Sequence, residues 1–158
     1  MINLKKKNNE VYYTKNNLEF INYKHINFLK KKLKVSKRKR VRICLHKDNS
    51  RLHEMIIILS KNSYIRPHKH LRKAESIHVI EGSAEVVFFD NKGGIIKKVK
   101  LGNKNKKSNF YYRLSNSIFH TFKIKSKFFV FHEATEGPFL KNKTIYAKWS
   151  PPETNKFR

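Results

Sequence analysis

The amino-acid sequence predicts an all-β jelly-roll barrel that carries one short N-terminal helix. Helical periodicity almost disappears after residue 40. From there, short apolar or alternating runs are broken by turn residues, a pattern typical of an antiparallel sandwich or barrel. A chain of 158 residues suits a single domain. We expect residues 1–40 to form an arm and a helix that pack on the barrel, residues 41–153 to form the barrel, and residues 154–158 to form a tail.

The N-terminal residues divide into two parts. The first fifteen or so are polar and lack a sustained period, so we expect a loose arm or a short edge segment. From Leu18 to Leu33 the apolar positions follow the spacing of an amphipathic helix, which we expect to end near Val35. The basic run SKRKR then leads into the first barrel strand.

About eight strands follow the helix. We predict them at residues 41–46, 55–59, 76–80, 84–90, 95–101, 108–114, 118–124 and 128–134. Glu81-Gly82-Ser83 is interpreted as a tight hairpin connection, and residues 90–94, with the sequence DNKGG, as the next turn.

The formal net charge of +26 has two interpretations. One is a polyanionic partner, either nucleic acid or an anionic membrane surface. The other is compositional drift towards A- and T-rich codons, with lysines that are simply solvated. Lysine outnumbers arginine 29 to 8, whereas phosphate recognition tends to use the bidentate arginine fork. The scattered lysines favour drift, and nucleic-acid binding is the third of three functional hypotheses.

Cysteine content and hydropathy restrict the class of protein. Cys44 is the only cysteine, which excludes an intrachain disulfide and a thiolate-rich metal site. No apolar run approaches the roughly 18 residues of a membrane span, and the start lacks the pattern of a signal peptide. We therefore expect a cytoplasmic protein whose metal ligands, if any, are nitrogen and oxygen.

Four residues form a candidate metal site. His68 and His70 stand two positions apart, so on a strand their imidazoles project from the same face. After four intervening residues, Glu75 begins the next strand, and His120 opens an alternating strand that can lie beside them. Three imidazoles and a carboxylate suit iron, manganese, nickel, copper or zinc and leave coordination positions open. In the alternative interpretation these groups only pair with one another in a polar core.

The spacing of these residues carries a family resemblance. The sequence HxH, four residues, Glu, six residues, Gly runs without a gap from His68 to Gly82, and it resembles the first motif of the cupin superfamily. The surroundings of His120 resemble the second motif. The departures from the usual glycine and proline positions are Asn62, Ser115 and Ser117. The resemblance implies a cupin-type double-stranded β-helix. Such proteins commonly dimerise, and unsatisfied edge strands would permit a homodimer here, although the sequence does not determine the oligomeric state.

A closer resemblance is to the WbuC family of cupin-fold metalloproteins. It is carried by residues 42–46 (RICLH), 53–55 (HEM), 63–70 (SYIRPHKH), 75–82 (ESIHVIEG), 132–139 (HEATEGPF) and 147–153 (AKWSPPE). Because such proteins are often encoded beside polysaccharide or O-antigen genes, the resemblance implies a role in surface-sugar biosynthesis. It implies no particular reaction.

Four further residues are candidates for substrate contact or catalysis. Arg66 has the parity of the histidine pair, so it either reaches the cavity and binds an anionic group or is simply exposed. His46 and Glu133 either act as acid or base or satisfy a neighbour. Tyr64 either offers its hydroxyl to a ligand or packs.

Three histidines are not expected in the site, namely His25, His53 and His78. His78 has outward parity relative to Glu75. Residues 136–139 (EGPF) resemble a turn that closes the mouth of the barrel.

Three functions remain open. The first is an enzyme acting on a small sugar-related or polysaccharide-precursor molecule, as a metal-dependent isomerase, epimerase or oxygenase. The second is a non-catalytic module that binds a carbohydrate or nucleotide-sugar through its metal. The third is the charge-driven binding of nucleic acid.

Overall fold

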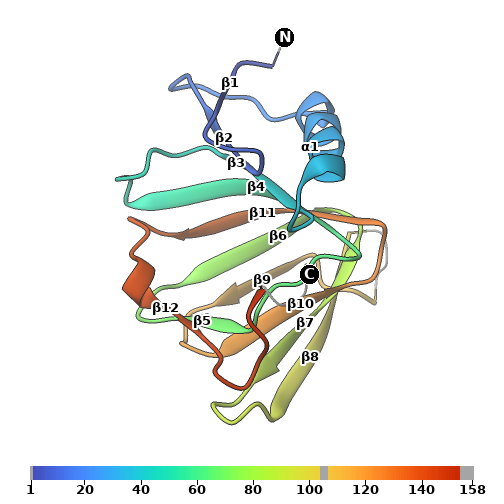
Figure 1. The fold of residues 1–158 in the computed structure, drawn as a ribbon, viewed down its shortest axis with the longest axis vertical. Helices are drawn as coiled ribbons and strands as arrows, with labels where there is room; N and C mark the ends of the chain where they lie inside the picture. The colour runs from blue at the N-terminus through green and yellow to red at the C-terminus, as the bar shows by residue number, and fades with distance from the viewer. Residues whose placement is uncertain (1, 104–106, 154–158) are drawn as a thin grey trace.

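The computed structural model describes residues 2–103 and 107–153, and the expected tail at 154–158 lies outside this range. Two β-sheets lie face to face, with one helix on the outer side of the larger sheet (Figure 1). No helix in the described ranges is both long enough and apolar enough to cross a bilayer.

The larger sheet has seven strands. In spatial order they are β1 (Leu4–Lys6), β2 (Val11–Thr14), β3 (Arg40–Cys44), β4 (Leu52–Ser60), β11 (Phe128–Glu136), β6 (Glu75–Glu81) and β9 (Tyr111–Leu114). All pairs are antiparallel except β2 with β3, which are parallel. Of the two alternatives for the N-terminal residues, β1 and β2 correspond to the edge segment.

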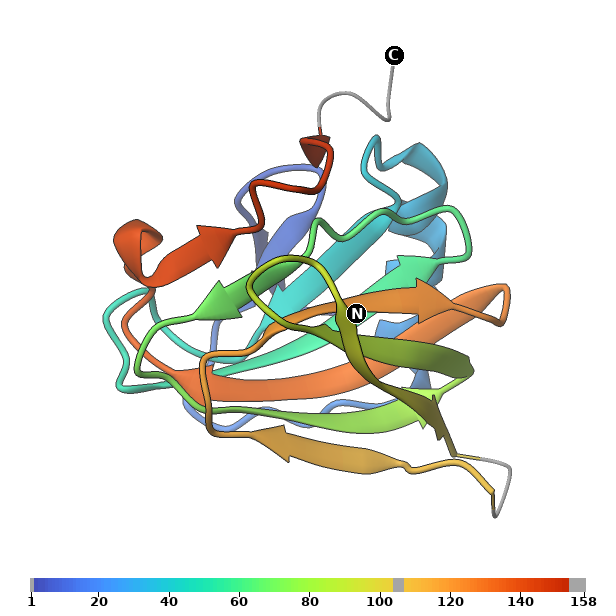
Figure 2. The same cartoon turned by 90° about the horizontal axis from the view of Figure 1, so that it is seen from below.

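The smaller sheet has five strands. In spatial order they are β12 (Thr144–Tyr146), β5 (His68–His70), β10 (Phe119–Ile124), β7 (Ser83–Phe89) and β8 (Ile95–Gly102). Figure 2 shows β12, β5 and β10 side by side. A short 3-10 helix, η1 (Lys141–Lys143), precedes β12. The predicted all-β jelly roll with one short N-terminal helix is thereby confirmed.

The expected closed barrel is corrected. The named strands form two separate sheets, and a single isolated bridge, between Leu101 and Asn109, links the β8 end to the segment before β9. The reason is that the chain changes sheet between β6 and β7, so no continuous hydrogen-bond ladder runs around the structure.

Each face of the larger sheet packs against a different partner. Because side chains alternate along a strand, Val41 and Ile43 of β3 point outward, where they pack with Leu29 and Leu33 of α1 (Tyr23–Val35). The inner face meets the smaller sheet around the rings of Phe122, Phe129 and Phe131. The two sheets thus enclose these phenylalanine rings and the cavity described below.

The helix begins later than the periodicity predicts. Asn22 caps it, accepting a hydrogen bond from the Lys24 amide at 3.0 Å, while Nδ1 of His25 accepts one from the Asn22 amide at 3.3 Å. This reciprocal cap fixes the start at Tyr23 and leaves Leu18 71% exposed. The predicted end at Val35 is confirmed, and His25 serves the cap and not the candidate site.

The predicted hairpin at Glu81-Gly82-Ser83 is wrong. The segment joins β6 to β7, which belong to different sheets. Gly82 has a φ of +87°, and a Cβ there would collide with the backbone carbonyl of Phe128. Only glycine fits this crossing. The predicted turn at residues 90–94 is confirmed, because it links β7 to its antiparallel partner β8, and Asp90 Oδ1 accepts hydrogen bonds from the amides of Lys92 and Gly94.

Gly82→Ala is expected to lower the free energy of unfolding by about 2 kcal/mol or more, since it combines a positive φ with a collision. Gly102→Ala is the matched control, because its added Cβ would meet only ordinary contacts, 3.4 Å or more from Ser108. Urea unfolding of both variants checks this. Equal stability of Gly82→Ala and the wild type would contradict the role given to Gly82.

Candidate metal centre

Three histidines meet on the inner face of the smaller sheet. His120 of β10 lies directly opposite His68 of β5 in the ladder, and His70 follows two residues later on the same face. The ring centroids lie 4.7 Å apart for His68 and His120, and 5.0 Å apart for His68 and His70. One ligating atom from each ring lies within 4.8 Å of the others, close enough to share one metal ion.

Backbone carbonyls orient two of the imidazoles. Nδ1 of His68 lies 2.9 Å from the Arg66 carbonyl oxygen, and Nδ1 of His120 lies 3.0 Å from that of Ile118. A carbonyl only accepts, so Nδ1 carries a proton in each ring, and Nε2 of a neutral ring keeps its lone pair. Nδ1 of His70 lies 3.2 Å from the hydroxyl of Thr144 on β12. Such partners are the usual way in which a metal-binding histidine is held.

Glu75 approaches the histidines from the opposite sheet, as the first residue of β6. Its carboxylate oxygens lie 3.0 Å from Nε2 of His120 and 3.4 Å from Nε2 of His70. The hydroxyl of Tyr112 on β9 donates to the same carboxylate at 3.3 Å. The structure therefore brings together all four residues of the sequence-derived candidate set, with donor atoms that fit a divalent transition metal.

Electrostatics favour a cation at this point. Burial raises the pKa of Glu75, but the His120 imidazole and the other two rings outweigh burial and lower that pKa to about 2. Burial, aided by the His120 and His70 rings, lowers the pKa of His68 to about 3. Burial opposes protonation of His120 as well, yet Glu75 raises its pKa overall. At neutral pH the site thus holds a buried carboxylate beside a neutral His68.

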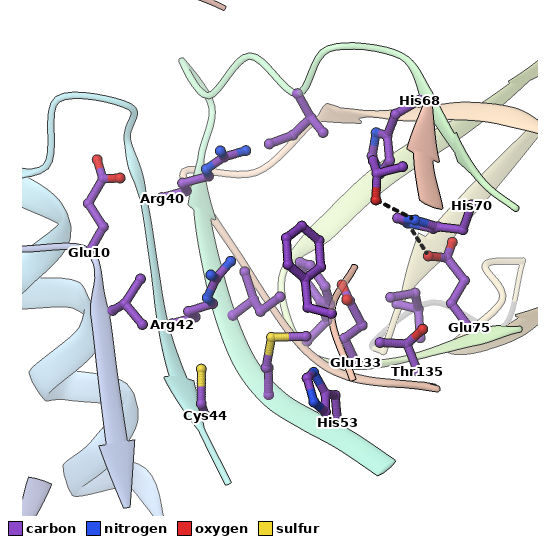
Figure 3. A pocket seen from close by; sticks show the side chains of 18 of the residues that line it. Glu10, Arg40, Arg42, Cys44, His53, His68, His70, Glu75, Glu133 and Thr135 are labelled. Carbon is purple, nitrogen blue, oxygen red and sulfur yellow. Dashed lines mark hydrogen bonds and ion pairs between the residues drawn. The ribbon is translucent and has the colours of Figure 1, made fainter. Parts of the chain in front are cut away.

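A cavity of about 430 Å³ opens from the candidate ligands into the space between the sheets. Figure 3 shows His68, His70 and Glu75 on one side, Arg40 and Arg42 of β3 on the other, and Glu133 and His53 between them. The inward-facing residues of β3, β4 and β11 form the wall opposite the histidines.

Glu133 is a polar group of this wall. It lies on β11, two residues beyond the buried Phe131 on the same face, and pairs with Ile77 of β6. Burial raises its pKa to about 7, helped by the charge of Glu75, while Arg42 acts in the opposite direction. A carboxyl that titrates near neutral pH can hold or release a proton within the cavity.

His46 and His53 stack at the same wall, with ring centroids 3.8 Å apart. Nδ1 of His46 lies within 3.0 Å of both backbone polar groups of Glu54. His53 was not expected near the site, yet it lines the cavity, is 5% exposed, and its Nε2 has no hydrogen-bond partner among the described residues. Burial is the main cause that lowers the pKa of both rings.

Two sequence-derived candidates lie elsewhere. Arg66 donates to the Ala147 carbonyl at 2.7 Å and to the Ser150 hydroxyl at 3.2 Å, and Tyr64 donates to the Pro151 carbonyl at 2.9 Å. Neither lines the cavity. Arg66 was expected to share the face of His68 and His70 because it lies two residues before His68. This expectation fails because β5 begins only at His68, so the alternation of side chains along the strand does not extend to Arg66. Both side chains instead fasten the C-terminal segment.

Two other expectations agree with the structure. His78 is exposed, on the opposite face of β6 from Glu75. The turn at residues 136–139 lies at the cavity, where Phe139 contributes to the lining, and Lys73 Nζ donates to the carbonyls of Glu136 and Pro138 at 2.7 Å each.

Sequence reasoning missed Arg40, Arg42 and Cys44 of β3, which line the cavity. Their alternation was the available signal, because residues two apart on a strand share a face. The two arginines belong to a basic run, Lys30 to Arg42, whose charges look like an ordinary solvated surface.

A family model described as "Domain of unknown function (DUF6016)" matches residues 21–101. No curated protein matches the chain. Among solved structures, protein SO0799 from Shewanella oneidensis superposes with a TM-score of 0.53 at 10% identity, covering 65% of each chain. At this identity the likeness shows the fold alone.

Two further solved structures are similar. They are oxalate decarboxylase from Bacillus subtilis (TM-score 0.49, 21% identity, 62% of this chain and 24% of that one) and pumpkin seed globulin (TM-score 0.48, 14% identity, 61% and 23%). The chain therefore spans less than two thirds of the length of each of these three structures. The resemblance to the WbuC family is not confirmed by these matches.

The His53 environment has a consequence for stability. The pKa of His53 is lower in the folded protein than in the unfolded chain, so the unfolded state takes up a proton first as the pH falls below about 6.5, and stability is lost. His53→Phe removes this titrating group, so the free energy of unfolding of the variant should fall less steeply between pH 7 and pH 5 than that of the wild type. The difference in slope is at most about 1.4 kcal/mol per pH unit. Urea unfolding at three pH values measures it, and an unchanged slope contradicts the expectation.

Proposed function

This chain belongs to the DUF6016 family, a domain of unknown function, and we propose from its own site that it is a cupin-type protein that binds one divalent transition metal ion. The observation that carries the proposal is the convergence of His68, His70 and His120 with the Glu75 carboxylate. Nitrogen and oxygen donors of this kind suit iron, manganese, zinc or nickel.

The orientation of the rings favours metal binding over a merely polar core. In a cluster held only by its own hydrogen bonds, each ring would need a proton between itself and the carboxylate. Glu75 favours such a proton on His120, but the Nδ1–H groups of His68 and His120 donate to backbone carbonyls, and His68 stays neutral at physiological pH. Neutral imidazoles and an ionised carboxylate are the forms that coordinate a metal.

The cavity supports an enzyme acting on a small molecule. Its volume of about 430 Å³ lies within the range of ligand pockets, roughly 300–1,000 Å³. A bound metal would act as a Lewis acid that polarises a substrate oxygen. Glu133, whose carboxyl titrates near neutral pH in the same cavity, would exchange a proton with the substrate, as an isomerase or epimerase requires.

The identity of the substrate rests on resemblance. The likeness to the WbuC family supports a sugar-related or polysaccharide-precursor substrate, and the cupin likeness supports a homodimer. Oxygenation is the alternative reaction if the metal is iron. A non-catalytic module that binds a carbohydrate through its metal uses the same four ligands, and an absence of turnover with metal-loaded protein would favour it.

Elemental analysis tests the metal site. Wild-type protein is expected to hold about one transition-metal ion per chain, and a His68→Ala, His70→Ala double variant almost none, because two of four donors are lost. His78→Ala is the control, since its ring is exposed on the other face of β6. If the wild type holds no more metal than the double variant, even after supplementation, the proposal fails.

The carboxyl of Glu133 can be followed directly by infrared spectroscopy. In metal-free protein, the difference between wild type and Glu133→Gln should show a protonated carboxyl band that disappears near pH 7. Loading with Mn²⁺ should move this midpoint to lower pH, because the cation offsets the repulsion from Glu75. A midpoint near 4.5 in the metal-free protein would rule out the proposed proton exchange.

A further inference from the structure

The cations that line the cavity are almost all neutralised. Arg40 forms two hydrogen bonds of 3.2 Å with Glu153, Arg38 binds Glu10 at 2.6 Å, and Lys7 binds Asp48 at 3.1 Å. The lining also contains Lys73, which donates to two backbone carbonyls. Arg42 alone among the lining cations of residues 2–103 and 107–153 has no oxygen partner for its guanidinium.

The backbone holds Arg42 facing the cavity. It sits in the middle of β3, opposite Ile57 of β4, and its neighbours Val41 and Ile43 are buried against α1 on the other face. Its side chain therefore projects from the cavity face of β3, where it is exposed to solvent. Figure 3 shows it on the wall opposite His68, His70 and Glu75. The next inward residue is the buried Cys44, whose thiol hydrogen-bonds to Arg42. Burial raises the pKa of this thiol, while Arg42 acts in the opposite direction.

A guanidinium in this position is prepared for an oxyanion. Its planar fork offers parallel N–H groups to a carboxylate or a phosphate. The nearby Glu133 does not hydrogen-bond to it. Arg40, the previous inward residue of β3, is paired with Glu153, and Ile57 and Leu59 of β4 are apolar. A neutral ligand would leave this charge with the Cys44 thiol as its hydrogen-bond partner and without an anion.

We propose that Arg42 binds an anionic group, a carboxylate or a phosphate, on a small molecule whose other end reaches the metal centre. This inference rests on the proposed metal site and specifies its substrate class. Two strands separate β3 from β6, so their backbones lie roughly 14 Å apart across the sheet. Through Ile57 and Phe131, Arg42 is in register with Val79, four residues beyond Glu75, which adds roughly 13 Å along the strand direction. The side chains of Arg42 and Glu75 narrow this distance from both sides, and the remaining space suits an extended small molecule and not a polymer.

Isothermal titration calorimetry on Mn²⁺-loaded protein tests the proposal. The probes are succinate, glycerol 3-phosphate and inorganic phosphate, with neutral glycerol as the uncharged comparison. About 0.15 M salt suppresses non-specific binding to a chain with a charge of +26. The wild type should bind at least one of the anions and not glycerol, and the preferred probe then distinguishes a carboxylate ligand from a phosphate ligand.

Variants assign the binding to Arg42. Arg42→Gln should weaken the binding of the preferred anion roughly tenfold or more, because a charge-assisted hydrogen-bond pair is lost. Arg42→Lys keeps the charge without the fork and should bind with intermediate affinity; it is the deciding variant if Arg42→Gln does not fold. Arg51→Gln removes the same charge from an exposed residue outside the cavity and should bind as the wild type does.

The metal content of every sample is measured first, so that the two proposals fail separately. A wild type without metal overturns the proposed function, whatever the anions do. A metal-loaded wild type that binds none of the three anions overturns the assignment of Arg42. Equal weakening by Arg42→Gln and Arg51→Gln overturns it too, because the binding would then reflect net charge alone.

Discussion

The contacts of the Glu75 carboxylate with the His120 and His70 rings are the interaction on which the rest of this structure depends. A carboxylate that is only 6% exposed is costly to bury unless positive charge or hydrogen bonds compensate it. Here the compensation comes from the opposite sheet. The two sheets are therefore joined by polar contacts at the histidines, whereas the rings of Phe122, Phe129 and Phe131 join them elsewhere. Whatever cation lies between them, a proton or a metal, determines how well the sheets are held together at the histidines.

The local part of the fold could be predicted from the sequence. Strand positions follow from alternation and turn residues, both of which act over a few neighbours, so β6, β7, β8, β10 and β11 lie close to their predicted ranges. The candidate site could be predicted for the same reason, because His68, His70 and Glu75 lie within a few residues of one another in the sequence. His120 required the further assumption that a distant strand lies beside β5, and the ladder between β5 and β10 supports that assumption.

The errors at Gly82, Arg66, His53 and Arg42 share one cause. Each depends on the tertiary contacts of a segment, which the local sequence pattern does not reveal. The Gly82 crossing looks like a hairpin until the sheet of each strand is known. Arg66 has the parity of the histidines, but contacts with the C-terminal segment determine its direction. His53 and Arg42 were not identified as cavity residues. Alternation shows which residues share a face of β3 or β4, but not which of the two faces lies towards the second sheet.

The short pairing of β12 with β5 has a consequence for the order of assembly. Thr144, which holds the His70 ring, and the carbonyl of Ala147, which holds Arg66, both follow every candidate ligand in the chain. During synthesis the four ligands leave the ribosome before these supports exist. His68 and His120 have their carbonyl partners within their own segments, at Arg66 and Ile118, whereas the His70 ring lacks its hydroxyl partner until residues 144–147 have docked. The orientation of His70 is therefore the last part of the site to be fixed during chain growth.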